Sequence, residues 1–334
     1  MKHHAAYFAL LSLSVFAMCA PRTDSQDNRI KVVFDTDANN ELDDQHALAY
    51  LLFNSDVFDV KGVTVNATHS GGNIDSQYAE AERIMKLTGA HGKMQLLKGA
   101  DSRFTDIRPT SGERTYDGSE AVNFIIEQAN ASKNEKLVLL AVGKLTTVAL
   151  ALVKEPSLAD KIRLVWLGSN YPKPGEYNQD NDTVAMNYLL NTNVPFEMVT
   201  VRYGENSGTS AVIASQDEIN QKMPGKGPKA ATPVEGRHGG TYTTFGDYSV
   251  SLFEHIHFHD STKTRSLFDM VAVAILKNES WGQRKTIPAP ILINNEWVER
   301  PNNSRTITVW ENFDKEAIMR DFYETMDEPV LVKE

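Results

Sequence analysis

Residues 30–44 read IKVVFDTDANNELDD, an apolar run followed at once by an acidic one. Five acidic side chains fall within the ten residues 35–44. Like charges at such short spacing repel one another, so the end of a buried strand is a costly place for them unless another charge compensates. The stretch therefore predicts a buried strand that ends in a functional acidic cluster.

Strand-like and helix-like segments alternate along the chain after this stretch. The strand-like segments are short apolar runs at residues 30–34, 60–65, 137–142, 162–167 and 196–201, and the helix-like segments lie at 45–52, 77–87, 146–153 and 183–190. The run LVLLAV is apolar throughout, as expected of a strand that is buried on both faces of a sheet. We expect an α/β fold, a single domain with a mostly parallel, Rossmann-like sheet flanked by helices.

Polar segments follow the predicted strands. They read FDTDANNELDD, ATHSGGN, VGKLT and GSNYPKPGEYNQDND. Ligands of parallel sheets bind at the carboxyl ends of the strands, so these segments are expected to converge on one oxygen-rich pocket. Residues 223–241, rich in Gly, Pro and Lys, are predicted to form a long loop of the kind that often serves as a lid or binding loop.

The overall charge argues against a nucleic-acid partner. The 334 residues include 34 Lys and Arg against 44 Asp and Glu, a formal net charge of −10. Sequence-independent binding to phosphates needs an excess of basic residues, and the sequence has no Lys/Arg-rich run. An acidic chain instead suits a protein that holds a hard cation.

The N-terminus is a separate unit. MKHH is followed by the apolar run AAYFALLSLSVFAMCA, so residues 1–20 are expected to be a signal peptide and residues 28–334 the folded domain. Export to the periplasm, or to a membrane as an anchored lipoprotein, is the predicted localisation. Cys19, at the end of the apolar run, is a candidate for a lipid anchor; plain cleavage after Ala17 or Ala20 is the alternative. No cysteine follows, so a disulfide in the mature domain is excluded.

The acidic cluster has a simple explanation as the start of a helix. Asp43 and Asp44 would then cap a helix that begins near Gln45 and interact favourably with its dipole. This explanation does not account for Asp35 and Asp37, which follow the apolar strand immediately.

Two ligand-binding motifs fit only in part. An EF-hand needs glycine at the sharp turn, where this chain has Asn40, and a bidentate Glu where it has His46. A phosphatase of the haloacid-dehalogenase type also begins with a hydrophobic-D-x-D motif, but it needs Thr or Val soon after the second Asp, where this chain has Ala38-Asn39-Asn40. A divalent metal at a catalytic strand end explains all the acids, and oxygen ligands favour Ca²⁺ or Mg²⁺ over zinc.

Four motifs in order resemble those of the inosine–uridine-preferring nucleoside hydrolase family. Residues 35–44 correspond to its D-T-D-P-G-x-D-D opening, two residues longer and without Pro-Gly. Residues 143–147 resemble G-P-L-T-N, and residues 168–178 resemble G-G-N…A-E-F-N with the six-residue spacing from Asn to Glu retained. Residues 267–272 resemble the H-D-P-x-A helix start. The resemblance covers about residues 30–327 and implies the nucleoside hydrolase fold.

The resemblance implies calcium-dependent hydrolysis of the N-glycosidic bond of ribonucleosides. The implied calcium ligands are the carboxylates of Asp37, Asp44 and Asp269 and the backbone carbonyl of Thr146. Asp37 is also the implied general base. The implied substrate contacts are Asp43 and Asn178 at the ribose hydroxyls, Asn170 and Glu176 at the 5′ end, and Asn73, preferred over His69, in the loop after the second strand.

The leaving-group side departs from the family pattern. Phe268 stands where the family commonly has His before the final Asp, and a phenyl ring cannot donate a proton. Phe268 is expected to contact the substrate by stacking on a base or a sugar face. The candidate proton donors elsewhere are His238, His255, His257 and His259.

These observations predict an enzyme, an exported N-glycosyl hydrolase with a small nucleoside substrate and no nucleic-acid partner. The family resemblance also implies a homo-oligomer, a dimer or a tetramer. Two alternatives stay open at this point: a hydrolase of another ribosyl compound, and a lipoprotein that binds ribose or nucleosides without turnover.

Overall fold

The structure is a computed structural model that describes residues 1–3, 27–133, 135–258 and 261–333. Its centre is an eight-stranded sheet in the order β11-β14-β6-β5-β4-β1-β2-β3. All neighbours pair in parallel except β11, which runs antiparallel to β14 at one edge. The strands are β1 Ile30–Thr36, β2 Phe58–Val65, β3 Gln95–Lys98, β4 Leu137–Ala141, β5 Ile162–Ser169, β6 Phe196–Thr200, β11 Gln283–Pro288 and β14 Thr306–Glu311.

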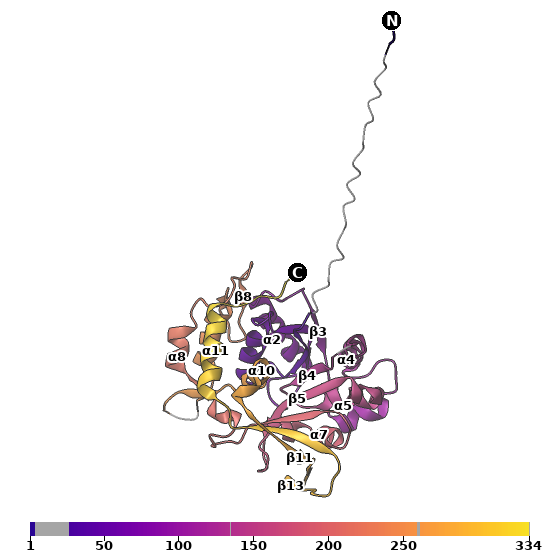
Figure 1. Cartoon of the computed structure of the whole chain (residues 1–334). Coiled ribbons are helices and arrows are strands. Elements are labelled where there is room, and N and C mark those ends of the chain that lie inside the picture. Colours follow the sequence, from indigo (N-terminus) through magenta and orange to yellow (C-terminus); the bar gives the residue numbers. More distant parts are fainter. Residues whose placement is uncertain (4–26, 134, 259–260, 334) are drawn as a thin grey trace.

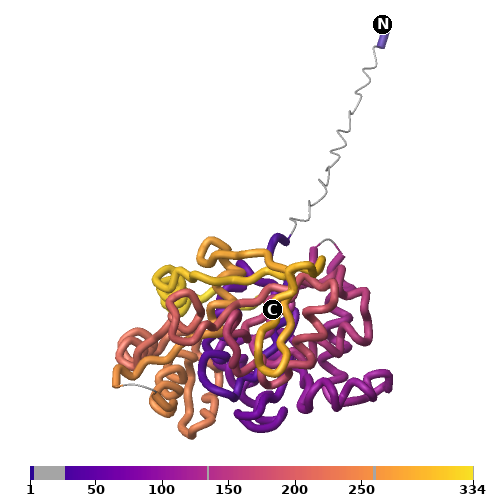
Figure 2. The backbone as a smooth tube through the Cα atoms, turned by 90° about the horizontal axis from the view of Figure 1, so that it is seen from below, coloured from indigo at the N-terminus to yellow at the C-terminus, as the bar shows by residue number. Residues whose placement is uncertain are grey.

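Helices cover both faces of the sheet (Figure 1). Alternate residues of β4 show why, because Val138 and Leu140 belong to one hydrophobic cluster and Leu137 and Leu139 to the other. The helices are α1 Asp43–Leu52, α2 Ile74–Leu87, α3 Phe104–Ile107, α4 Ser119–Ala131, α5 Thr146–Lys154, α6 Tyr177–Asn181, α7 Thr183–Leu190, α8 Gln216–Lys222, α9 Phe245–His255, α10 Phe268–Lys277 and α11 Lys315–Asp327. In the view from below, the orange segments gather on the left and the magenta segments on the right, with indigo segments between them (Figure 2).

The predicted fold class is confirmed, and the predicted elements agree closely with the structure. Each predicted strand and helix has a counterpart whose ends differ by a few residues. The predicted loop 223–241 contains one short strand, β8 Val234–Glu235, and ends in a second, β9 Thr241–Tyr242, with which β8 pairs antiparallel. The remaining short pairs are β7 Ile213–Ser215 with β10 Thr264–Ser266, and β12 Ile291–Ile293 with β13 Glu296–Val298.

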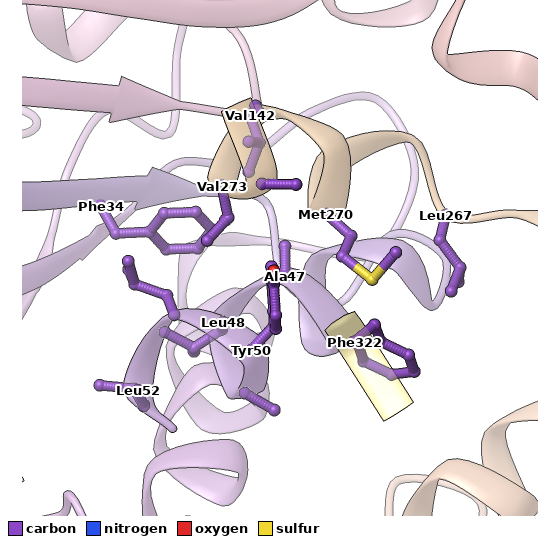
Figure 3. Packing of buried hydrophobic residues seen from close by; sticks show 14 of the residues in the cluster. Phe34, Ala47, Leu48, Tyr50, Leu52, Val142, Leu267, Met270, Val273 and Phe322 are labelled. Carbon is purple, nitrogen blue, oxygen red and sulfur yellow. The ribbon is translucent and has the colours of Figure 1, made fainter. Parts of the chain in front are cut away.

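Helices α1 and α10 pack against each other on one face of the sheet (Figure 3). Figure 3 shows Ala47 and Leu48 of α1 beside Met270 and Val273 of α10, with Phe322 of α11 closing the layer. These side chains are fully buried, and small residues on α1 allow the close approach. The contact matters for function because the first turn of each helix carries aspartates, Asp43 and Asp44 in α1 and Asp269 in α10.

Both ends of the described domain lie at the amino edge of the parallel strands. The backbone N–H of Ile30 donates to the carbonyl of Val57, just before β2, and Val330 pairs with Asn54 in an isolated bridge. The hydroxyl of Ser55 donates to the carbonyl of Leu331. Cys19 and most of the predicted signal peptide lie outside the described residues, and none of the described helices is long and apolar enough to span a membrane.

Candidate active site

A cavity of about 400 Å³ opens at the carboxyl ends of β1, β4, β5 and β6. Its lining brings together most of the residues predicted from the strand-end motifs. The predicted residues in the lining are Asp37, Asp43, Asp44, Glu176, Asn178, Phe268 and Asp269. Six carboxyl side chains and one guanidinium line the described wall, so the cavity is strongly acidic.

The four aspartates of the lining reach the cavity from three elements. Asp37 follows β1, Asp43 and Asp44 form the first turn of α1, and Asp269 lies in the first turn of α10. Because α1 and α10 pack side by side, their N-termini point toward the same space, and the positive ends of the two helix dipoles favour carboxylates there. The hydroxyl of Thr36 holds Asp44 in place with a hydrogen bond of 2.5 Å.

Three of these carboxylates could hold a metal ion together. One oxygen from each of Asp43, Asp44 and Asp269 lies within 4.8 Å of the other two, and all three side chains are buried. Burial raises the pKa of Asp43 to about 7, and burial with the neighbouring carboxylates raises the pKa of Asp44 and Asp269 well above the usual value. A divalent cation would relieve this cost, and an all-oxygen donor set suits a hard ion such as Ca²⁺ or Mg²⁺.

Asp37 lies next to this group and has its own support. Its Oδ2 accepts a hydrogen bond of 2.6 Å from the hydroxyl of Thr68. Burial raises its pKa to about 6, although the Lys144 cation works in the opposite direction. Gly143 leaves room for this carboxylate, because a Cβ there would lie 2.8 Å from Asp37 Oδ1 and 2.7 Å from Asn66 Nδ2.

Asn178 and Glu176 present acceptors to the cavity from the start of α6. Asn178 Nδ2 donates to the carbonyl of Val142 at 2.7 Å, whereas its buried Oδ1 has no hydrogen-bond partner among the described residues. Such an orphaned acceptor in a cavity wall fits a ligand hydroxyl. Glu176 caps α6 by accepting from the backbone N–H of Gln179, and burial raises its pKa to about 8.

Three predicted site residues lie away from the cavity lining. Asn73 is exposed and caps α2 by accepting from the backbone N–H of Ser76 at 3.1 Å. Asn170 is buried beside the cavity and accepts from the backbone N–H of Tyr203, a lining residue, at 3.0 Å. The hydroxyl of Thr146 donates to Asp182 at 2.5 Å, and the strand-end residue that lines the cavity in this region is Val142.

The sequence profile of the inosine-uridine preferring nucleoside hydrolases matches residues 32–330. The chain belongs to this family. It is an N-glycosyl hydrolase, and the resemblance stated from its motifs is confirmed.

Solved structures of nucleoside hydrolases share the fold at low sequence identity. A plant nucleoside hydrolase, PpNRh1, superimposes with a TM-score of 0.70 at 16% identity, covering 90% of this chain and 99% of that one. The inosine-uridine preferring nucleoside hydrolase of Bacillus anthracis superimposes with a TM-score of 0.63 at 18% identity, covering 90% of this chain and 100% of that one. The purine-preferring ribonucleoside hydrolase of Gardnerella vaginalis superimposes with a TM-score of 0.64 at 19% identity, covering 89% of this chain and 98% of that one. No curated protein sequence matches significantly.

In this nucleoside hydrolase, Phe268 is half-buried in the cavity wall and meets Tyr203 edge to face, with ring centroids 5.9 Å apart. The candidate histidine donors lie elsewhere. His238 is exposed and stacks on His255, with ring centroids 4.7 Å apart. The backbone carbonyl of His257 accepts a hydrogen bond from Arg265 Nη1. His238, His255 and His257 are absent from the described lining, and His259 lies outside the described residues.

Several lining residues were not predicted from the sequence. Arg265 and Glu41 form an ion pair in the wall, and Tyr203, Val142 and Ser210 complete parts of it. Arg265 comes from the short strand β10, whose sequence has no periodicity that marks it as part of a site. Glu41 belongs to the acidic stretch 35–44, but the family motifs imply no role for it.

Proposed function

We propose that this nucleoside hydrolase cleaves ribonucleosides to free base and ribose in a calcium-dependent reaction. The observation that carries the proposal is the buried group of Asp43, Asp44 and Asp269 in one cavity with Asp37. A nucleoside fits such a cavity, because its ribose diol needs hydrogen-bond and metal partners and its base needs an aromatic wall.

The ion would be held by the carboxylates of Asp44 and Asp269 from the buried group together with Asp37 from the same cavity, and Asp43, the third member of the group, would bind the ribose instead. A backbone carbonyl is the expected further ligand. The family resemblance implies the carbonyl of Thr146, but Val142 is the better candidate, because Val142 lines the cavity and Thr146 is absent from the described lining. When bound, Ca²⁺ would lower the pKa of the attacking water and neutralise the carboxylates.

Asp37 would accept the proton of the attacking water. Its carboxylate is fixed by Thr68 at the edge of the acidic group, and its pKa of about 6 leaves it mostly ionised at neutral pH. Water then attacks the anomeric carbon, the bond from that carbon to the base nitrogen breaks, and the transition state has oxocarbenium character.

The ribose would be oriented by groups around Asp37. Asp43 and Asn178 would accept from the ribose hydroxyls; both line the cavity, and the orphaned Asn178 Oδ1 supports this role. Glu176 faces the cavity as a contact for the 5′ hydroxyl. Asn170 would act indirectly, because it holds the backbone of Tyr203.

The test is an activity screen with purine and pyrimidine ribonucleosides, with and without a chelator. We expect release of ribose from at least one nucleoside, loss of activity in excess chelator, and recovery with Ca²⁺ in preference to Zn²⁺. Activity that survives exhaustive chelation would remove the metal from the proposal. Turnover of only a nitrophenyl riboside or another ribosyl compound would favour the alternative that the natural substrate is not a nucleoside.

We also propose that the protein is exported, with Cys19 as a candidate lipid anchor. The apolar N-terminal run supports export. Fractionation of cells followed by mass spectrometry of the mature N-terminus tests both points, because an unmodified N-terminus at another residue would exclude the anchor. Gel filtration tests the expected dimer or tetramer.

A further inference from the structure

We propose that Arg265 is a catalytic residue that stabilises the departing base, in place of a proton donor, and thereby favours bases with a carbonyl group. The proposal rests on the proposed nucleoside hydrolysis and concerns the part of the cavity that the carboxylates do not occupy. It answers how a base can leave when Phe268 stands at the position of the usual histidine.

Arg265 is the one basic residue in the described lining of the cavity. Its side chain is only 5% exposed, so its charge acts in a region from which most water is excluded. Electrostatic interactions are stronger in such surroundings than at the surface. None of the candidate histidines within the described residues reaches this wall.

The guanidinium is fixed by contacts on two sides. One terminal nitrogen forms an ion pair with Glu41 of the acidic loop, and Nη1 donates to the carbonyl of His257 at 3.0 Å. Glu41 is itself held, because its backbone carbonyl accepts from Arg237 Nη2 at 2.6 Å. A group positioned in this way needs little reorganisation when charge develops beside it.

The neighbouring side chains suit a flat base. Phe268 and Tyr203 meet edge to face and offer an aromatic surface, and both line the cavity with Arg265. A stacked base with a carbonyl oxygen, such as hypoxanthine, guanine or uracil, would direct an acceptor at the guanidinium.

The reaction step balances without an acid. As water attacks and gives its proton to Asp37, the electron pair of the breaking carbon–nitrogen bond passes to the base. That charge spreads onto the carbonyl oxygen, where Arg265 stabilises it by hydrogen bonding while keeping its own proton. The base anion then takes a proton from solvent. Arginine does not titrate in the working range, so this step has no acidic pKa.

The test compares two substrates in Arg265→Gln. Inosine has a poor leaving group with a carbonyl oxygen, whereas nitrophenyl riboside leaves readily. We expect kcat for inosine to fall by about 100- to 1,000-fold, the usual effect of removing one preorganised donor. We expect the rate with nitrophenyl riboside to stay within about threefold. The wild-type pH–rate profiles of the two substrates should share the same alkaline side.

Two further variants separate this role from a structural one. Glu41→Gln breaks the same ion pair but keeps the guanidinium, so inosine hydrolysis should fall less than tenfold. Arg163→Gln breaks a comparable pair with Glu197, outside the described lining, and should change neither substrate. The Tm and the Tm increase on adding Ca²⁺ report folding and the metal site in each variant.

Equal losses on both substrates in Arg265→Gln, with an unchanged Tm, would overturn the proposal. The same conclusion would follow if Glu41→Gln lost as much inosine activity as Arg265→Gln. If Arg265→Gln does not fold, Arg265→Lys, which keeps a cation, provides the same substrate comparison with a smaller expected loss. A wild-type protein that hydrolyses neither substrate would instead contradict the proposed function.

Discussion

At the scale of single residues, two buried aspartates that lie two positions apart in the sequence, Asp35 and Asp37, differ in their access to the cavity. Asp35 accepts from Thr64 and Asn66 inside the sheet and is absent from the described cavity lining. Asp37 lines the cavity and is held by one hydroxyl. Residues two positions apart on a strand share a face, so the two side chains have similar surroundings. Asp37 lies just beyond the end of β1, and this position along the chain brings it to the cavity wall.

Asp37→Asn should lower kcat for a good nucleoside substrate by about 10²- to 10⁴-fold, because an amide cannot accept the proton of the attacking water. The fold should persist, since an amide oxygen can still accept from Thr68 and the variant removes one buried charge. Steady-state kinetics with circular dichroism measure both effects. Asp35→Asn is the matched control and should keep activity within about tenfold, and comparable losses in the two variants would deprive Asp37 of its special role.

At the scale of elements, the Gly-rich segment 223–241 is tied to the acidic loop by one arginine. Arg237 donates to the carbonyls of Asn39 at 3.1 Å and Glu41 at 2.6 Å, so the hairpin β8–β9 braces the residues just before α1. Arg237 Nε also donates to His238 Nε2 at 3.0 Å. Through Arg237, this segment therefore holds the backbone of the acidic loop that lines the cavity.

Arg237→Gln should loosen the acidic loop without unfolding the domain. The variant loses two charge-assisted hydrogen bonds that are partly exposed to solvent. This loss should lower the free energy of local opening of the loop by about 1 to 3 kcal/mol. Hydrogen exchange at residues 39–42 should then be about 10- to 100-fold faster, while exchange in β4 stays unchanged. Lys229→Gln, an exposed change in the same segment, is the control. Unchanged exchange at residues 39–42 would show that Arg237 does not brace the loop.

The elements that sequence could predict are those with strong apolar patterns. The fully apolar β4 and the regular face of α1 were predicted within a few residues, and the acids at their ends led to the cavity. The edge strand β11 was missed because its sequence, QRKTIP, is largely exposed and carries no buried face. Asn73 illustrates a second limit, because an asparagine that caps a helix and one that binds a ligand look alike before tertiary structure is known. Arg265 was missed because its strand has only three residues.

At the scale of the whole molecule, the acidic cavity couples metal content to stability and pH. Folding buries carboxylates whose pKa it raises, such as Asp43 to about 7 from an ordinary value of 3.8. Without a cation, the folded state therefore binds more protons than the unfolded state between these two values. The free energy of unfolding must then fall as the pH rises through this window and recover as the pH falls.

In excess chelator, we expect the free energy of unfolding to increase as the pH is lowered from about 7.5 to 5. The increase should be about 1.4 kcal/mol per pH unit for each carboxylate that takes up a proton. In saturating Ca²⁺ the carboxylates stay ionised, so this increase should disappear. His46, whose pKa burial lowers to about 4, has the opposite effect below about pH 6.5 in both conditions, so the measured quantity is the difference between them. Denaturant titrations at several pH values measure it.

Asp269→Asn is the control for this pH dependence, because it removes one carboxylate of the group and should reduce the slope in chelator. A metal-free protein and a Ca²⁺-saturated protein with the same pH dependence would contradict the coupling. So would a slope in chelator that is unaffected by Asp269→Asn.

The position of the N-terminus sets which way the cavity opens when the protein is attached to a surface. Ile30 begins β1 and so lies at the amino edge of the sheet. The strand is about 20 Å long, and Asp37, the residue after it, lies at the opposite edge in the cavity wall. A tether at the N-terminus would therefore attach the molecule at the edge of the sheet opposite the cavity, and the cavity would open toward the surrounding solution. Protein immobilised on beads through an N-terminal tag should accordingly keep the KM that it has in solution.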